Sequence, residues 1–87
     1  MASYHIEWKK SAISELRKLP KEIVPKIVSA VGELSSNPFP DGVNKLSGAE
    51  HTYRIRIGPY RVVYTVTKAT TIVEVIRVAH RKDVYGR

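Results

Sequence analysis

The residues best suited to chemistry are three arginines, Arg54, Arg56 and Arg61, in the C-terminal half of the chain. They lie in two runs of alternating residues that Gly58-Pro59 separates, a pattern typical of a β-hairpin. A two-residue turn at this point pairs Arg56 with Arg61 and directs all three arginines to one face, opposite the apolar side chains. Because guanidinium groups bind phosphate in a bidentate manner, this face predicts phosphate binding.

A last strand, residues 72–79, can add further groups to this face. Strict alternation places on one side Val73, Val75, Arg77, Ala79 and Arg81. If the last two strands pair as neighbours, Arg81 can join the hairpin arginines. His80 and Tyr85 then lie at the mouth of the same face, although alternation points His80 away from Arg81.

The charge of the chain is strongly positive and unevenly distributed. Fifteen Lys and Arg residues against eight Asp and Glu give a net charge of +7, and most of the excess lies after residue 50. Such a balance predicts a polyanionic partner, either nucleic acid or an acidic protein. The alternative is a merely solvated sheet face, but clustered arginines without an acid on the hairpin face favour a binding role.

Several classes of site are excluded by composition. The chain has no cysteine, so disulfides and thiolate sites are absent, and His5, His51 and His80 lack the spacing of metal ligands. No serine is accompanied by the His and Asp residues of a hydrolase triad, and no glycine-rich loop could hold a nucleotide. We therefore expect no cofactor and no metal. Without a signal sequence or a long apolar run, the expected location is the cytoplasm.

The N-terminal half predicts one strand and two helices. Residues 4–8 alternate as a short strand, and Ser11 is the expected N-cap of a helix through residue 18, with Glu15 on its solvated side. A second helix carries one apolar stripe, and Pro25 is compatible with it only in the first turn. The stripe consists of Ile23, Ile27, Val31 and Leu34.

Residues 35–50 are rich in Pro, Gly, Asn and Ser and predict a long loop, with Phe39, Val43 and Leu46 attaching it to the body of the protein. Three strands then follow. The expected class is α+β with the order β-α-α-β-β-β. We predict a twisted, mainly antiparallel sheet with two N-terminal helices packed on one face, in a single domain of residues 1–87.

Two motifs carry a resemblance to a known family. These are Gly-x-Tyr-Arg-x-x-Tyr at residues 58–64 and His-Arg-x-x-x-Tyr at residues 80–85, preceded by Leu-Arg-Lys-Leu-Pro and Asn-Lys-Leu-Ser-Gly. Their order and spacing resemble the RelE-like mRNA interferase branch of the RelE/ParE toxin superfamily, over essentially the whole chain.

This resemblance implies a toxin of a type II toxin–antitoxin system. Members of this branch are endoribonucleases that cleave mRNA in the ribosomal A site without a metal and so inhibit translation. The implied partners are an acidic RelB-like antitoxin, the ribosome and mRNA. A toxin–antitoxin hetero-oligomer that binds operator DNA through the antitoxin is also implied.

The resemblance also implies roles for individual residues. Arg61 resembles the arginine that grips the scissile phosphate, and Arg81 the one that stabilises the transition state or protonates the leaving 5′-oxygen. Tyr85 resembles the tyrosine that orients the attacked nucleotide. Arg54 and Arg56 stand where several members carry lysines implicated in activating the 2′-hydroxyl.

The general base is left open by this comparison. Arginine stays protonated in proteins and is a poor base, so the proton must go to Tyr85, to His80 or to a phosphate oxygen of the substrate. Histidine suits proton transfer near neutrality. The alternative for His80 is a strand-end residue without a chemical role.

Two other functions fit the same residues. A ParE-like toxin shares the fold, inhibits DNA gyrase and cuts nothing, and it generally lacks the pattern formed by Arg61, Arg81 and Tyr85. The other possibility is a non-catalytic module that binds RNA or an antitoxin.

Overall fold

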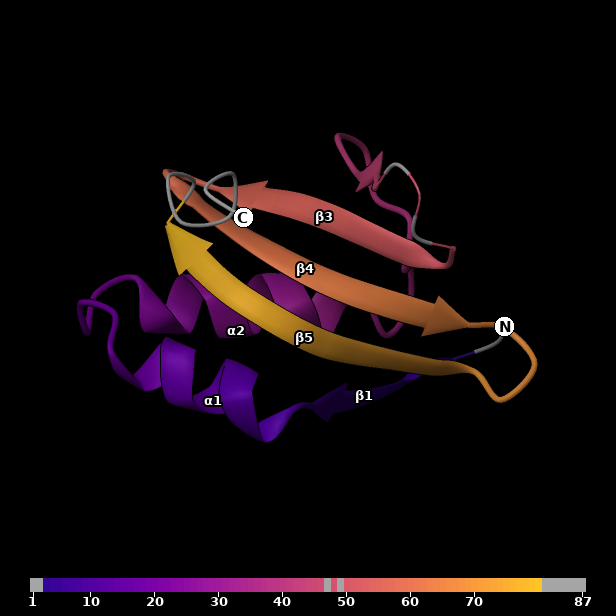
Figure 1. Cartoon of the computed structure of the whole chain (residues 1–87), viewed down its shortest axis with the longest axis horizontal. Coiled ribbons are helices and arrows are strands. Elements are labelled where there is room, and N and C mark those ends of the chain that lie inside the picture. The colour runs from indigo at the N-terminus through magenta and orange to yellow at the C-terminus, as the bar shows by residue number, and fades with distance from the viewer. Residues whose placement is uncertain (1–2, 47, 49, 81–87) are drawn as a thin grey trace.

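The computed structural model describes residues 3–46, 48 and 50–80, and in this part of the chain two helices cover one face of a mixed sheet (Figure 1). The elements are β1 (His5–Trp8), α1 (Lys10–Arg17), α2 (Val24–Glu33), β2 (Asn44–Lys45), β3 (Thr52–Ile57), β4 (Tyr60–Thr67) and β5 (Ile72–His80). The strand order is β1-β5-β4-β3-β2, with β1 parallel to β5 and the other pairs antiparallel. The predicted α+β class and the placement of both helices on one face are confirmed.

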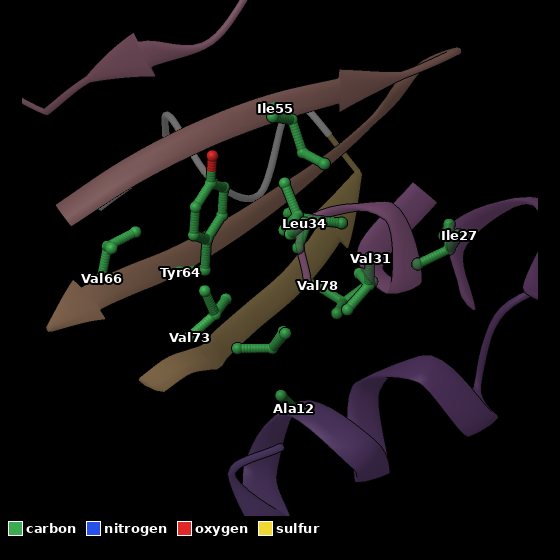
Figure 2. Close-up of a cluster of buried hydrophobic side chains, with 11 residues drawn as sticks. Ala12, Ile27, Val31, Leu34, Ile55, Tyr64, Val66, Val73 and Val78 are labelled. Carbon is green, nitrogen blue, oxygen red and sulfur yellow. The ribbon is translucent and has the colours of Figure 1, made fainter. Parts of the chain in front are cut away.

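The core lies between the helices and the central strands. Ala12 of α1 and Ile27 of α2 are fully buried against inward side chains of β4 and β5, such as Val62 and Val78 (Figure 2). Each helix has one apolar stripe, and burying a single aliphatic side chain contributes about 1.5–3 kcal/mol. One face of the sheet is therefore committed to stability, and the other is available for function.

The two predictions about helix termini have different outcomes. Pro25 lies in the first turn of α2, as required. The prediction that Ser11 is the N-cap of the first helix is wrong, because α1 begins at Lys10 and no side chain caps it. The backbone N–H of Lys9 donates to the carbonyl of Val75 at 2.9 Å, so the pairing of β1 with β5 fixes where the chain turns into the helix.

The loop predicted for residues 35–50 contains the short strand β2. Asn44 pairs with Arg54 and Lys45 with Tyr53, so β2 covers only the first part of β3. From residue 55 to residue 57 the outer edge of β3 has no strand partner among the residues described. Phe39 packs against the core and confirms the predicted attachment of this segment.

The hairpin of β3 and β4 has the predicted register. Ile57 pairs with Tyr60 and Arg56 with Arg61 across a two-residue turn. Gly58 has a φ of 58°, and a positive φ at the first central position only is the signature of a type II′ turn, which accommodates the negative φ of a following proline.

The last strand contains an irregularity that the sequence did not predict. Val63 of β4 pairs with Arg77. The next residue, Tyr64, pairs with Val75, so Ile76 is an extra residue in β5. A β-bulge of this kind reverses the alternation of side chains between the two faces.

The predicted grouping of β5 residues is therefore wrong in part. Val73 and Val75, expected on the arginine face, are buried in the core beneath the helices. After the bulge, Val78 enters the core and Ala79 stands opposite Arg61. Among the described residues of the predicted group, Arg77 and Ala79 follow the predicted parity.

Candidate functional site

Two rows of side chains cross the central strands on the face without helices. Each row takes one residue from β3, one from β4 and one from β5, because directly paired residues share a face. The rows are Arg56–Arg61–Ala79 and Arg54–Val63–Arg77. Four guanidinium groups therefore originate from two adjacent rows at the turn end of the hairpin.

Arg56 and Arg61 form the centre of this arrangement. They stand directly opposite each other, one pair away from the turn, in the position where antiparallel strands bring Cβ atoms to about 4.5–5.5 Å. Arg61 is only 3% exposed, whereas Arg56 is exposed. One guanidinium is thus held within the protein and the other faces solvent.

Arg77 has a different environment from the other three arginines. Its Nε donates to the carboxylate of Glu15 on α1 at 3.1 Å. The prediction that Glu15 is solvated is therefore wrong, since its side chain is 29% exposed and bound to β5. This ion pair offsets the charge of Arg77.

Acidic residues mark the other end of the same face. Glu7 of β1 and Glu74 of β5 are neighbours in register, and Glu74 pairs in turn with Thr65. The carboxylate oxygen Oε2 of Glu7 also lies 3.6 Å from Nε2 of His5. Cations and acids are therefore separated along the sheet, with a row of threonine and glutamate next to the arginine rows.

His80 lies on the opposite side of the sheet from Arg61. It pairs with Tyr60, and the two rings meet edge to face with centroids 5.5 Å apart. The ring of Tyr60 packs against the core beneath the helices. This agrees with the alternation that pointed His80 away from the arginine face.

Arg81 and Tyr85, the remaining predicted site residues, lie outside the described residues. Within the described ranges, no group of three or more His, Cys, Asp or Glu side chains could hold a metal ion. No helix among these residues is long and apolar enough to span a membrane.

A groove at the edge of β3, which the sequence did not reveal, reaches the arginines. It has a volume of about 580 Å³ and lies where β2 no longer covers the edge of β3. Its walls come from α2, from the segment between α2 and β2, and from β3, and they include Arg54, Arg56 and Arg61. Three of the four guanidiniums therefore border this groove.

Tyr64 holds one wall of this groove in place. Its hydroxyl donates to the carbonyl of Pro38 at 2.7 Å, which ties the segment after α2 to the central strand. Burial, and to a lesser extent the neighbouring Tyr53, raise the pKa of Tyr64 well above that of a free tyrosine. The phenol is therefore a structural hydrogen-bond donor rather than a proton carrier.

Comparisons with known proteins agree with this geometry. Residues 6–85 match the family model described as the ParE toxin of type II toxin–antitoxin systems, parDE. Toxin RelG of Mycobacterium tuberculosis is 34% identical over 85 residues, which cover 97% of this chain and 98% of RelG.

Solved structures show the same fold. The RelBE2 toxin–antitoxin complex of M. tuberculosis contains a chain with a TM-score of 0.79 and 32% identity, covering 92% of this chain and 100% of that one. An archaeal RelE–RelB complex from Pyrococcus horikoshii gives a TM-score of 0.81 at 27% identity, covering 91% and 96%. Because the family model spans nearly the whole sequence and these relatives carry RelE-type names, the chain belongs to the RelE/ParE superfamily of toxins from type II toxin–antitoxin systems.

Proposed function

We propose that this chain is an endoribonuclease that cleaves mRNA in the ribosomal A site, needs no metal, and so inhibits translation. The observation that carries the proposal is the pairing of Arg56 with Arg61 on the helix-free face, beside Arg54. Directly paired residues of neighbouring strands share a face, so the two guanidiniums can bind one anion together. A phosphodiester supplies two non-bridging oxygens that two guanidiniums can bind.

The reaction that fits these groups is attack of the ribose 2′-oxygen on the adjacent phosphorus. The O2′–P bond forms, the P–O5′ bond breaks, and negative charge grows on the non-bridging oxygens. Arg61 and Arg56 bind those oxygens more strongly as the charge develops, so they stabilise the transition state more than the ground state. The products are a 2′,3′-cyclic phosphate and a 5′-hydroxyl end.

The groups that transfer protons are assigned partly from the family resemblance. Arg81 is proposed to stabilise or protonate the leaving 5′-oxygen, and Tyr85 to orient the nucleotide. Since His80 lies across the sheet from Arg61, the proposal assigns the 2′-hydroxyl proton to Tyr85 or to a substrate phosphate oxygen.

The proposed partners follow from charge and from the related complexes. The similar chains from M. tuberculosis and P. horikoshii were solved bound to antitoxins named RelB or as RelBE complexes. With a net charge of +7, this chain suits an acidic RelB-like antitoxin, a ribosomal RNA environment and mRNA. The whole of residues 1–87 is proposed to act as one toxin domain.

The test is cleavage of a translating message by wild-type protein and Arg61→Ala, with the 5′ ends of the products mapped. One well-placed transition-state donor is worth about 10²–10³ in kcat, so Arg61→Ala should lose at least that much. Arg17→Ala serves as the control, because Arg17 is an exposed cation at the end of α1. Equal loss in both variants would show that the effect is one of net charge alone.

A second candidate is inhibition of DNA gyrase, because the matched family model is described as the ParE toxin. Gyrase-dependent DNA breaks combined with an intact message would select this function. Codon-spaced cuts in the message without DNA breaks would select the nuclease.

A further inference from the structure

Glu15 joins the first helix to the last strand through both of its carboxylate oxygens. Oε1 accepts the backbone N–H of Val78 at 2.8 Å, and Oε2 accepts the Nε–H of Arg77 at 3.1 Å. The two contacts join Glu15 to residues that lie 62 and 63 positions later in the sequence. One side chain thus binds two consecutive residues of β5.

The contact occupies a position where β5 has lost its neighbouring strand. Trp8, the last residue of β1, pairs with Val75, and beyond that point α1 packs along the outer edge of β5 (Figure 1). Val78 is 1% exposed, and a buried backbone N–H needs an acceptor. Glu15 takes the place of the missing strand carbonyl.

The two bound residues follow directly after the bulge at Ile76. A bulge redirects the side chains that come after it, and this one sends Val78 into the core and places Ala79 beside Arg61. If β5 were regular, the alternation that directs Val75 to the helix-covered face would also direct Ala79 there, and Val78 would face the arginines.

We propose that Glu15 is a positioning residue for the reaction. By holding the bulge of β5 in place, it determines which side chains of the last strand lie on the same face as Arg61. The inference rests on the proposed ribonuclease function. Ala79 is the last described residue on the arginine face, and the sequence continues within two and six residues to Arg81 and Tyr85. The clamp acts on the strand that leads to the proposed catalytic residues, without touching the substrate.

Two substitutions of Glu15 test the length of its side chain and its negative charge separately. Glu15→Gln keeps an oxygen at the same distance as an acceptor for the Val78 N–H but loses the ion pair with Arg77. Glu15→Asp keeps the charge but is one methylene shorter, so it cannot hold both contacts with the helix in place. Glu22→Ala is the control at an exposed glutamate.

Each variant is assayed for kcat and KM on a translating message and for hydrogen exchange of the Val78 amide by NMR. A shift of about 1 Å can lower a rate by about 100-fold, so Glu15→Asp should lose kcat on that scale with little change in KM, and its Val78 amide should exchange faster. Glu15→Gln and Glu22→Ala should retain most of kcat and slow exchange.

The inference is overturned if Glu15→Asp exchanges faster at Val78 yet keeps its kcat, since the bulge then has no role in the reaction. It is also overturned if Glu15→Gln loses as much kcat as Glu15→Asp, because the charge of Glu15 rather than the clamp is then responsible. A wild-type protein that cuts no RNA refutes the proposed function and the catalytic part of the inference. In that case the exchange rates still decide whether the clamp exists.

Discussion

Replacing Arg56 by Gln should make the fold more stable while making the proposed nuclease less active. Arg56 stands directly opposite Arg61, and its side chain is exposed. Glutamine keeps most of the side-chain length but removes one of the two like charges. A gain in stability that accompanies a loss of activity is the expected mark of a residue kept for function.

The size of the gain follows from the register. A directly opposed like-charge pair destabilises an antiparallel sheet by about 0.2–1 kcal/mol. For a domain of this length, 1 kcal/mol corresponds to about 4–8 °C in Tm, so Arg56→Gln should melt about 1–8 °C higher at low salt. At about 1 M salt the Debye length falls to about 3 Å, and the gain should largely disappear.

Arg54→Gln is the matched control, because Arg54 is on the same strand and face but pairs with Val63. Thermal melts of the three proteins at low and high salt give the comparison, and cleavage assays on the same preparations give the activity. The reasoning is refuted if both substitutions raise Tm equally, or if the gain for Arg56→Gln does not change with salt.

Two further predictions concern the groove and the chemistry. Tyr64→Phe leaves the carbonyl of Pro38 without its donor and should cost about 1–3 kcal/mol in urea unfolding. Because the pKa of Tyr64 is raised in the folded state, its contribution is present below the ordinary tyrosine pKa of about 10 and is lost as pH rises above it, so Tyr64→Phe should also weaken the alkaline loss of stability. For the reaction, EDTA should leave the cleavage rate unchanged and the products should carry a 2′,3′-cyclic phosphate, whereas loss of cutting on chelation would refute the metal-free mechanism.

The hairpin could be predicted from sequence because its signals are local. Gly58-Pro59 specifies a two-residue turn, and the turn specifies that Arg56 and Arg61 are paired. Strict alternation in residues 53–57 then assigns each side chain to a face. The central feature of the candidate site therefore depends on fewer than ten consecutive residues.

The bulge in β5 could not be predicted in the same way. Between Ile72 and Val78 apolar residues occupy both parities, so the sequence does not show which side belongs to the core. The groups that stabilise the bulge are distant in sequence, since Glu15 belongs to the first helix. The start of α1 was missed for a related reason, because pairing of β1 with β5 overrides the capping preference of Ser11.

The strand β2 was missed because its two residues are polar and exposed and carry no strand signal of their own. They become a strand only because the edge of β3 offers pairing positions at Tyr53 and Arg54. The groove depends on the same fact, since it opens where this pairing ends. The groove therefore depends on how far an edge strand extends, and this is set by the tertiary structure rather than by a local sequence pattern.

The distribution of charge on the helix-free face is the strongest reason to connect the arginines with function. If that face were only solvated, mixing the available acids with the arginines would remove the repulsion between Arg56 and Arg61 at no structural cost. The chain does place acids on this face, but Glu7 and Glu74 stand side by side in a separate row, where they add a second like-charge pair. We expect this separation of charge along the face to attract a polyanion to the turn end of the hairpin and to repel it from the other end.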